Sequence, residues 1–176
     1  PPPGYQYPPQ QPYGAAPQHS PWGEYASWWS RVGAQLLDGL ITTVIFIGPL
    51  IAGIVLAVKD LEYNSFTDEY EGTVNGSGVL IAVVAGLLYF AFDLWNRGIR
   101  VGTKGQSLGK QVVGIRVAKD VDGQLLGAGT GFLRWLVAIA AGIVPFGSLL
   151  DVLWPLWDDK KQTLHDKVIG SVSLRK

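Results

Sequence analysis

The 176-residue sequence contains no cysteine and no methionine. Without cysteine there are no disulfides and no thiolate metal ligands, and with only two histidines we expect no metal site and no bound cofactor. Because methionine is missing even at position 1, we expect the true start of the chain to lie upstream. Charged residues are scarce as well, at 16% against about 25% in an average soluble domain. The deficit comes from long uncharged runs, which are typical of membrane proteins.

Two of these runs are long enough to cross a bilayer. The run 32–58 holds a single charged residue, Asp38, and the run 79–96 ends beside Trp95. At about 1.5 Å per residue the first exceeds a hydrocarbon core of roughly 30 Å, so it can span with some tilt. We therefore predict an all-α membrane protein with transmembrane helices over 31–58 and 79–96.

The loops on either side of the second helix differ in charge. Loop 59–78 has one lysine against five acidic residues, whereas loop 97–130 has six basic residues against two acidic ones. Basic loops stay in the cytoplasm. The sequence thus predicts an acidic external loop, a basic cytoplasmic loop and a cytoplasmic N-terminus.

A third hydrophobic segment, 131–157, could cross once, but Pro145, Gly147 and Pro155 interrupt it. It is followed by a basic tail, 158–176. The segment "QSLGKQVVGIRVAK" from Gln106 resembles "QTLHDKVIGSVSLR" from Gln162. Two such segments pair most simply as short amphipathic strands on the cytoplasmic side. We therefore favour a re-entrant third segment over a third crossing, and the crossing remains the alternative.

The N-terminal residues 1–21 hold eight of the eleven prolines. This Pro/Gln/Tyr-rich composition predicts a disordered tail, and a docking segment for a partner is the alternative. Residues 22–30 predict a short helix in the lipid headgroup region, because amphipathic aromatic rings prefer that layer. Its Trp22, Trp28 and Trp29 are candidates for docking onto a partner.

Ionisable residues lie in or beside the hydrophobic runs. Arg31 and Asp38 are seven residues apart and share a helix face, with Asp38 about 10 Å deeper. A direct pair between them is one hypothesis. Charges at this depth are costly in lipid, so they should face the bundle interior and pair with one another. The candidate residues are Arg31, Asp38, Asp93 and Arg134, joined by His165 and Asp166 if the tail folds back. They form either a structural ion-pair network or an ion path.

Other motifs in the sequence do not indicate a catalytic or nucleotide-binding site. "GTKGQSLGKQ" has three residues instead of four between Gly105 and Gly109, so it is not a phosphate-binding loop. No nucleophile–base pair has a readable spacing, and the net charge is zero. We expect no enzyme activity and neither a nucleotide nor a nucleic-acid partner. Small residues four apart, Gly48/Ala52 and Ala82/Gly86, suit close helix packing.

Several motifs together resemble the RDD family of membrane proteins, named for one arginine and two aspartates. They are "RVGAQLLDGLI", "TKGQSLGKQVVGIRV" followed by a "DG" turn, "FLRWL", and "QTLHDKVIGSVSL". The resemblance covers about residues 28–175 and implies a multi-pass protein of a bacterial plasma membrane. It places the family arginine at Arg31, one aspartate at Asp38 and the other at Asp166, with Asp93 as the alternative. Transport, including sodium–proton exchange, has been proposed for some family members.

The Pro-rich tail joined to this module is similar to actinobacterial proteins. It also resembles accessory membrane proteins of the actinobacterial cytochrome bcc–aa3 respiratory supercomplex. The partners that this implies are the lipid bilayer and other membrane subunits, such as respiratory complexes III and IV. We favour a non-catalytic accessory subunit, and the alternative is a small cation or proton transporter that uses the intramembrane carboxylates.

Overall fold

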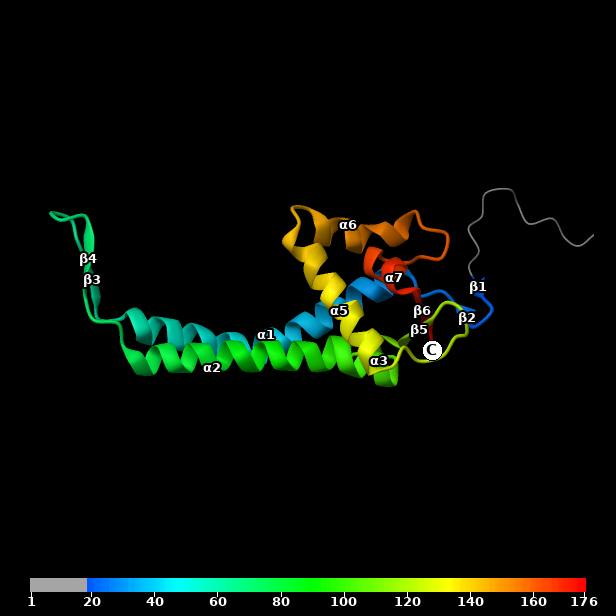
Figure 1. Ribbon diagram of the computed structural model, residues 1–176, viewed down its shortest axis with the longest axis horizontal. Helices are drawn as coiled ribbons and strands as arrows, with labels where there is room; N and C mark the ends of the chain where they lie inside the picture. Colours follow the sequence, from blue (N-terminus) through cyan, green and yellow to red (C-terminus); the bar gives the residue numbers. More distant parts are fainter. Residues whose placement is uncertain (1–18) are drawn as a thin grey trace, which may run out of the picture.

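A computed structural model describes residues 19–176. The predicted disordered tail, 1–21, lies outside the described residues except for its last three. Figure 1 shows an elongated molecule: two long antiparallel helices form a hairpin, a small β-hairpin caps one end, and the remaining helices and strands gather at the other. We call that second end the head.

The helical hairpin consists of α1 (Trp28–Val58) and α2 (Gly76–Asp93). Ser27 caps α1 by accepting the Ser30 N–H, and Asn75 caps α2 by accepting those of Ser77 and Gly78. α2 continues through a π-helical turn, η1 (Leu94–Ile99), into α3 (Arg100–Lys104). Trp28–Val58 and Gly76–Lys104 are both long and apolar enough to cross a membrane.

Small residues bring α1 and α2 together, and one of the four expected residues, Ala82, takes part. A Cβ on Gly53 would lie 2.5 Å from the backbone nitrogen of Ala82, and one on Gly78 would lie 2.2 Å from that of Ala57. Gly48 and Gly86, in contrast, have open space around them. Close packing of small residues is therefore confirmed at Ala82, while Gly48 and Gly86 do not contribute to it, because sequence spacing alone does not say which helix face meets the partner.

The acidic loop between α1 and α2 is a β-hairpin of β3 (Leu61–Asn64) and β4 (Glu69–Gly72). Its strands pair with Leu61 opposite Gly72. Figure 1 shows it projecting beyond the helix tips, far from the head.

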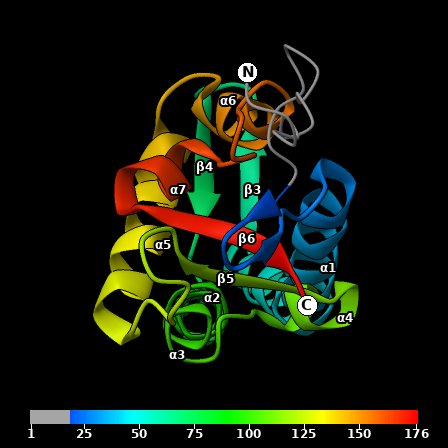
Figure 2. The same cartoon turned by 90° about the vertical axis from the view of Figure 1, so that its right-hand side faces the viewer.

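In the head, α4 (Leu108–Val113) leads into β5 (Ile115–Lys119), and α7 (Leu164–Ile169) leads into β6 (Ser171–Arg175). The two strands pair antiparallel, with Val117 opposite Ser173. Figure 2 shows them between α1 on one side and α5 and α7 on the other. The two matching segments therefore pair as predicted, while their position relative to a bilayer stays a prediction.

The third hydrophobic run is broken, as its prolines indicate. α5 (Ala128–Ile143) ends before Pro145, and Phe146 takes a left-handed conformation with φ 61° before α6 (Gly147–Leu153) begins. A single 3-10 turn, η2 (Trp154–Leu156), follows. Both helices fall short of the length needed to cross a bilayer. The sharp bend fits the re-entrant form, and its depth in a membrane stays a prediction.

The expected interfacial helix over 22–30 forms only from Trp28. Upstream of it the chain is extended: β1 (His19–Ser20) pairs with β2 (Gly23–Glu24), and Tyr25 bridges to Leu174 of β6. Tyr25 packs there with Ala118, Val172 and Leu174 in the core of the head. Aromatic spacing predicted a helix, but burial of Tyr25 against the sheet favours an extended segment.

Candidate functional site

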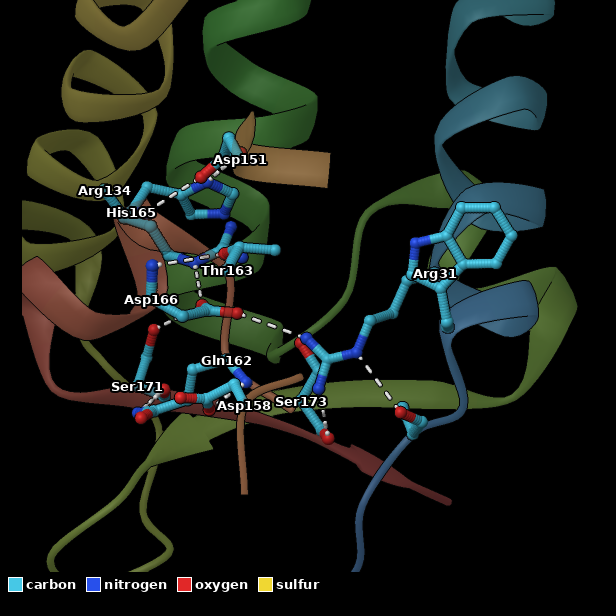
Figure 3. A network of polar contacts seen from close by, with 12 residues as sticks. Arg31, Arg134, Asp151, Asp158, Gln162, Thr163, His165, Asp166, Ser171 and Ser173 are labelled. Atoms are coloured by element: carbon cyan, nitrogen blue, oxygen red, sulfur yellow. Dashed lines mark hydrogen bonds and ion pairs between the residues drawn. The ribbon is translucent and has the colours of Figure 1, made fainter. Parts of the chain in front are cut away.

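The best-buried charged group of the head is Asp166, on the first turn of α7. Its side chain is fully buried and lies between two arginines, with Arg134 Nε 2.9 Å from Oδ1 and Arg31 Nη1 3.3 Å from Oδ2. The Ser171 hydroxyl also donates to Oδ1, at 2.6 Å. Because α1, α5 and α7 supply these groups, the carboxylate joins three helices (Figure 3).

Arg31 is anchored along its whole guanidinium. Nε donates to the carbonyl of Ala26 and Nη2 to that of Ser173, each at 3.2 Å. Figure 3 shows it reaching across from α1 toward Asp166. The hypothesis of a direct pair with Asp38 is therefore wrong. Long-range folding brings Asp166, 135 residues away, closer to Arg31 than the residue two turns along its own helix.

Asp38 lies at a second buried polar centre, where uncharged groups donate hydrogen bonds to its carboxylate. Its Oδ1 accepts from Asn96 Nδ2 at 2.9 Å and from the Gly109 N–H at 2.7 Å, and its Oδ2 accepts from the Ser107 hydroxyl at 2.5 Å. Asn96 also accepts the Leu108 N–H at 2.9 Å. The π-helical turn brings Asn96 to this position, and such turns often occur at functional sites.

The third centre pairs Asp151 of α6 with His165 of α7. Oδ1 of Asp151 accepts the backbone N–H of His165 at 3.0 Å, and Oδ2 lies 2.7 Å from its ring Nδ1. Both side chains are buried. This bidentate contact joins α6 to α7.

Asp93, at the end of α2, accepts from the Trp135 indole N–H at 2.8 Å. Its other oxygen lies 3.0 Å from Arg97 Nε, an ion pair without hydrogen-bond alignment. Asp93 therefore connects α2 and η1 to α5. It lies outside the Arg31–Asp166 cluster.

A polar cavity of about 290 Å³ lies among these centres. Four basic side chains and three carboxylates line it together with polar and apolar groups. The charged lining residues are Arg31, Arg97, Lys110, Arg134, Asp38, Asp93 and Asp151. Across residues 19–176, no three histidine or carboxylate groups are placed to hold a metal ion together.

Burial and neighbouring charges shift the pKa values of two adjacent residues on α7, His165 and Asp166. Burial alone would raise the pKa of Asp166, but the charges of Arg134 and Arg31 hold that pKa far below its usual range. Burial, and then the charge of Arg134, lowers the pKa of His165, against the opposing effect of Asp151. Asp166 is thus ionised and His165 neutral at physiological pH.

The three docking candidates differ in what they contact. Trp22 donates its indole N–H to the Asp120 carbonyl at 3.0 Å, and Trp28 donates its own to the Val152 carbonyl at 2.8 Å. Trp29 packs edge-on against Trp28 but is 75% exposed. Among the three, Trp29 has the surface free for a partner, and the docking role of all three stays a prediction.

All six charged residues singled out in the sequence lie in the head or at its junction with the hairpin. Sequence reasoning missed Asp151, Asn96, Lys110, Ser107 and Thr163. The repeat itself carried the signal for the last two, since Ser and Thr occupy matching positions before a short apolar run, as helix caps do. Asp151 is a charged residue inside the hydrophobic run 131–157, the same signal that identified Arg134. Asn96 is uncharged and carried no such signal.

The fold and these centres define a helical, membrane-type protein whose head is joined by buried ion pairs and hydrogen bonds. The RDD family model matches residues 25–170, and the chain belongs to the RDD family, whose members are membrane-associated. Membership, together with two apolar helices, supports a multi-pass protein. The orientation of the N-terminus stays a prediction.

Two curated mycobacterial proteins are similar along most of the chain. The proline-rich antigen of Mycobacterium leprae is 34% identical over 92% of this chain and 65% of its own length. The proline-rich antigen homolog of Mycobacterium tuberculosis H37Rv is 30% identical over 86% of this chain and 64% of its own length. The chain thus spans slightly less than two thirds of these relatives. No solved structure matches the chain.

Proposed function

We propose that the chain is a non-catalytic accessory subunit that associates, through its helical hairpin, with a larger integral membrane complex. The observation that carries this proposal is an apolar groove of about 440 Å³ on the hairpin. Side chains of α1 and α2 alone line it, and all of them are apolar: Ile45, Phe46, Pro49, Leu80, Ile81, Val84, Ala85 and Leu88. A groove of this kind accepts a neighbouring transmembrane helix by van der Waals packing.

The buried charges support the same role. Asp38, Asp151 and Asp166 each accept hydrogen bonds from donors on other elements. The contacts of Asp38 and Asp166 hold the head to the hairpin, and that of Asp151 joins α6 to α7 within the head. A rigid head at one end and an apolar groove along the hairpin suit a subunit that docks laterally.

The resemblance to accessory proteins of the cytochrome bcc–aa3 supercomplex identifies the first complex to look for. A tagged chain is recovered from gently solubilised native membranes, and the proteins that accompany it are identified by mass spectrometry. Stoichiometric subunits of one large complex support the accessory role, and respiratory subunits among them would name the partner. Recovery of the chain alone contradicts the proposal.

A photocrosslinking amino acid tests the groove directly. Placed at Val84, it lies in the groove. Placed at Val83, which is also exposed but lies outside the groove, it provides a matched control. We expect one defined crosslinked subunit from position 84 and none from position 83. Equal crosslinking at both positions would argue against a docking groove.

A small cation or proton transporter is the second candidate, favoured by the polar cavity beside Asp38 and Asp93. Against it, α1 has no ionisable residue after Asp38 up to its end at Val58. The test is cation-dependent proton flux in proteoliposomes. Loss of flux in a folded Asp38→Asn variant would support transport, and unchanged flux would remove Asp38 from any ion path.

A further inference from the structure

Several N–H donors in the polar cavity have no acceptor among residues 19–176. Arg134 binds Asp166 through Nε, and no acceptor contacts its two terminal nitrogens. The ammonium of Lys110 likewise has no hydrogen bond or ion pair within the described chain, and the terminal nitrogens of Arg97 have none either. Arg134 is only 6% exposed, and its terminal nitrogens are open to the cavity, where an acceptor from outside the chain can meet them.

The carboxylates of the same cavity are already engaged. Asp38 takes three hydrogen bonds from Asn96, Ser107 and Gly109. Asp93 takes the Trp135 indole N–H, and Asp151 is held by His165. Their oxygens therefore face protein donors. The groups left to meet a ligand are cationic, so the cavity suits an anion.

The position of the cavity along α1 relates it to the bilayer. Residues 39–58 form an uninterrupted uncharged stretch of the helix. At about 1.5 Å per residue it is roughly 30 Å long, which matches the hydrocarbon core. Asp38 marks the point where that stretch begins. The cavity beside it therefore lies at the level of lipid headgroups if the hairpin spans the membrane.

The wall of the cavity is mixed in character. Ala138 and Ile139 of α5 and Val152 of α6 supply apolar surface, and Gln35 of α1 supplies an amide. A ligand that fits this wall has a charged group on one side and hydrocarbon on the other. A volume of about 290 Å³ accommodates a phosphate group, since one water needs only about 30 Å³.

We propose that this cavity binds the phosphate group of an anionic phospholipid, with Lys110, Arg97 and Arg134 as the donors and the α5 wall against the lipid chain. Arginine presents a planar fork to phosphate, and lysine acts as a point charge. This site does not depend on the accessory role.

The ionisation of Lys110 supports the assignment. Burial, and then the charge of Arg134, lowers the pKa of Lys110 to about 8. The nearby charges of Asp38 and Asp166 oppose this shift, and that of Arg97 adds to it. A phosphate beside the ammonium would raise this pKa again, because a nearby negative charge favours the charged form of lysine. Binding and protonation of Lys110 therefore favour one another.

The test uses the full chain in nanodiscs of phosphatidylcholine, with or without phosphatidylglycerol. We expect phosphatidylglycerol to raise the melting temperature by about 5 °C. Lys110→Gln should abolish this increment while leaving the melting temperature in phosphatidylcholine unchanged or higher, because it removes a poorly compensated charge. Lys104→Gln, at an exposed lysine of the neighbouring helix α3, is the matched control and should keep the increment.

A second arm adds inorganic phosphate to the chain in phosphatidylcholine. A Lys110-dependent rise with phosphate and none with phosphatidylglycerol would support the anion site but assign it to a soluble phosphate compound. An increment that persists in Lys110→Gln would overturn the proposal, because a general surface effect of anionic lipid does not depend on one lysine. Absence of any increment in the unsubstituted chain, with either anion, would also overturn it.

Discussion

The two matching segments, 106–119 and 162–175, have the same local architecture in the structure. Ser107 and Thr163 cap six-residue helices, Gly114 and Gly170 end them in the left-handed conformation, and a five-residue strand follows each. The repeat places Val117 and Ser173 at equivalent positions, and these two residues pair with each other at the centre of the sheet. The units are therefore related by an approximate twofold axis through that pair.

The equivalence extends to their polar contacts. Gln106 Nε2 donates to the carbonyl of the first residue of β5, and Gln162 Nε2 does the same in β6, both at 2.8 Å. In each unit an outside carboxylate accepts the N–H of the second helical residue: Asp38 from Gly109 and Asp151 from His165. The two segments thus share one backbone arrangement. Each binds a carboxylate from a different helix, α1 for the first segment and α6 for the second.

The difference lies in the third helical residue, which is Lys110 in one unit and Asp166 in the other. Asp166 is neutralised by two arginines, whereas Lys110 faces the cavity. The second segment therefore stabilises the head through the buried ion pairs of Asp166. The first segment presents the ammonium of Lys110 to the cavity, where a ligand can bind. The substitutions below test this division, beginning with the largest expected effect.

Removing the charge of Asp166 should reduce the stability of the fold more than any other change. Asp166→Asn leaves two buried arginines without their counter-charge, and removal of one partner of a buried pair costs about 3–5 kcal/mol. We expect the melting temperature in detergent to fall by about 10 °C or more. Asp159→Asn, an exposed residue of the same tail, is the control and should be neutral. A small loss at Asp166 would mean that the arginines find other partners.

The next effect distinguishes the second helical residues of the two units. A Cβ on Gly109 would lie 2.1 Å from the Ala34 carbonyl oxygen, so α4 approaches α1 too closely for any side chain. Gly109→Ala should cost about 3 kcal/mol, because backbone on both sides must shift. Gly39→Ala provides the control, since nothing lies within 4 Å of its added Cβ, and it should be neutral or slightly stabilising. Chemical denaturation in mild detergent measures both.

The glutamines test the symmetry itself. Gln106→Leu and Gln162→Leu each leave one strand carbonyl without its side-chain donor, at a cost of about 1–2 kcal/mol. Equal losses at the two sites are the expected outcome of an equivalent frame. Clearly unequal losses in melting temperature would show that the two segments, although alike in backbone structure, do not contribute equally to stability.

Much of this architecture could be predicted from the sequence. The two long apolar runs predicted the helical hairpin, Pro145 predicted the bend, and the repeat predicted the paired strands. Polar caps before short apolar runs are local signals, which a sequence shows directly. The predicted clustering of Arg31, Arg134 and Asp166 came from the cost of charge at membrane depth, a physical constraint that acts without knowledge of the fold.

The partners of individual side chains could not be predicted in this way. Arg31 and Asp38 share a helix face, yet Arg31 binds Asp166 and Asp38 binds Ser107 and Gly109. The contacts of Asp38 depend on the approach of α4 to α1, where Gly109 packs closely against Ala34. The contact of Arg31 depends on where the C-terminal segment places α7. The π-helical turn that positions Asn96 also left no trace in hydrophobic periodicity.

The smallest effect concerns the pH response of the first unit. The pKa of Lys110 is about 8 in the folded chain and about 10.4 when unfolded. Between these values the unfolded state binds more protons, so stability rises with pH. The gain is about 1 kcal/mol once screening in the half-buried cavity is allowed for. Lys110→Gln should flatten the difference in melting temperature between pH 7.5 and pH 9.5, and Lys104→Gln should not. Equal pH responses in both variants would place the ammonium of Lys110 in solvent, and only Asp166, of the two equivalent residues, would then be a buried charge.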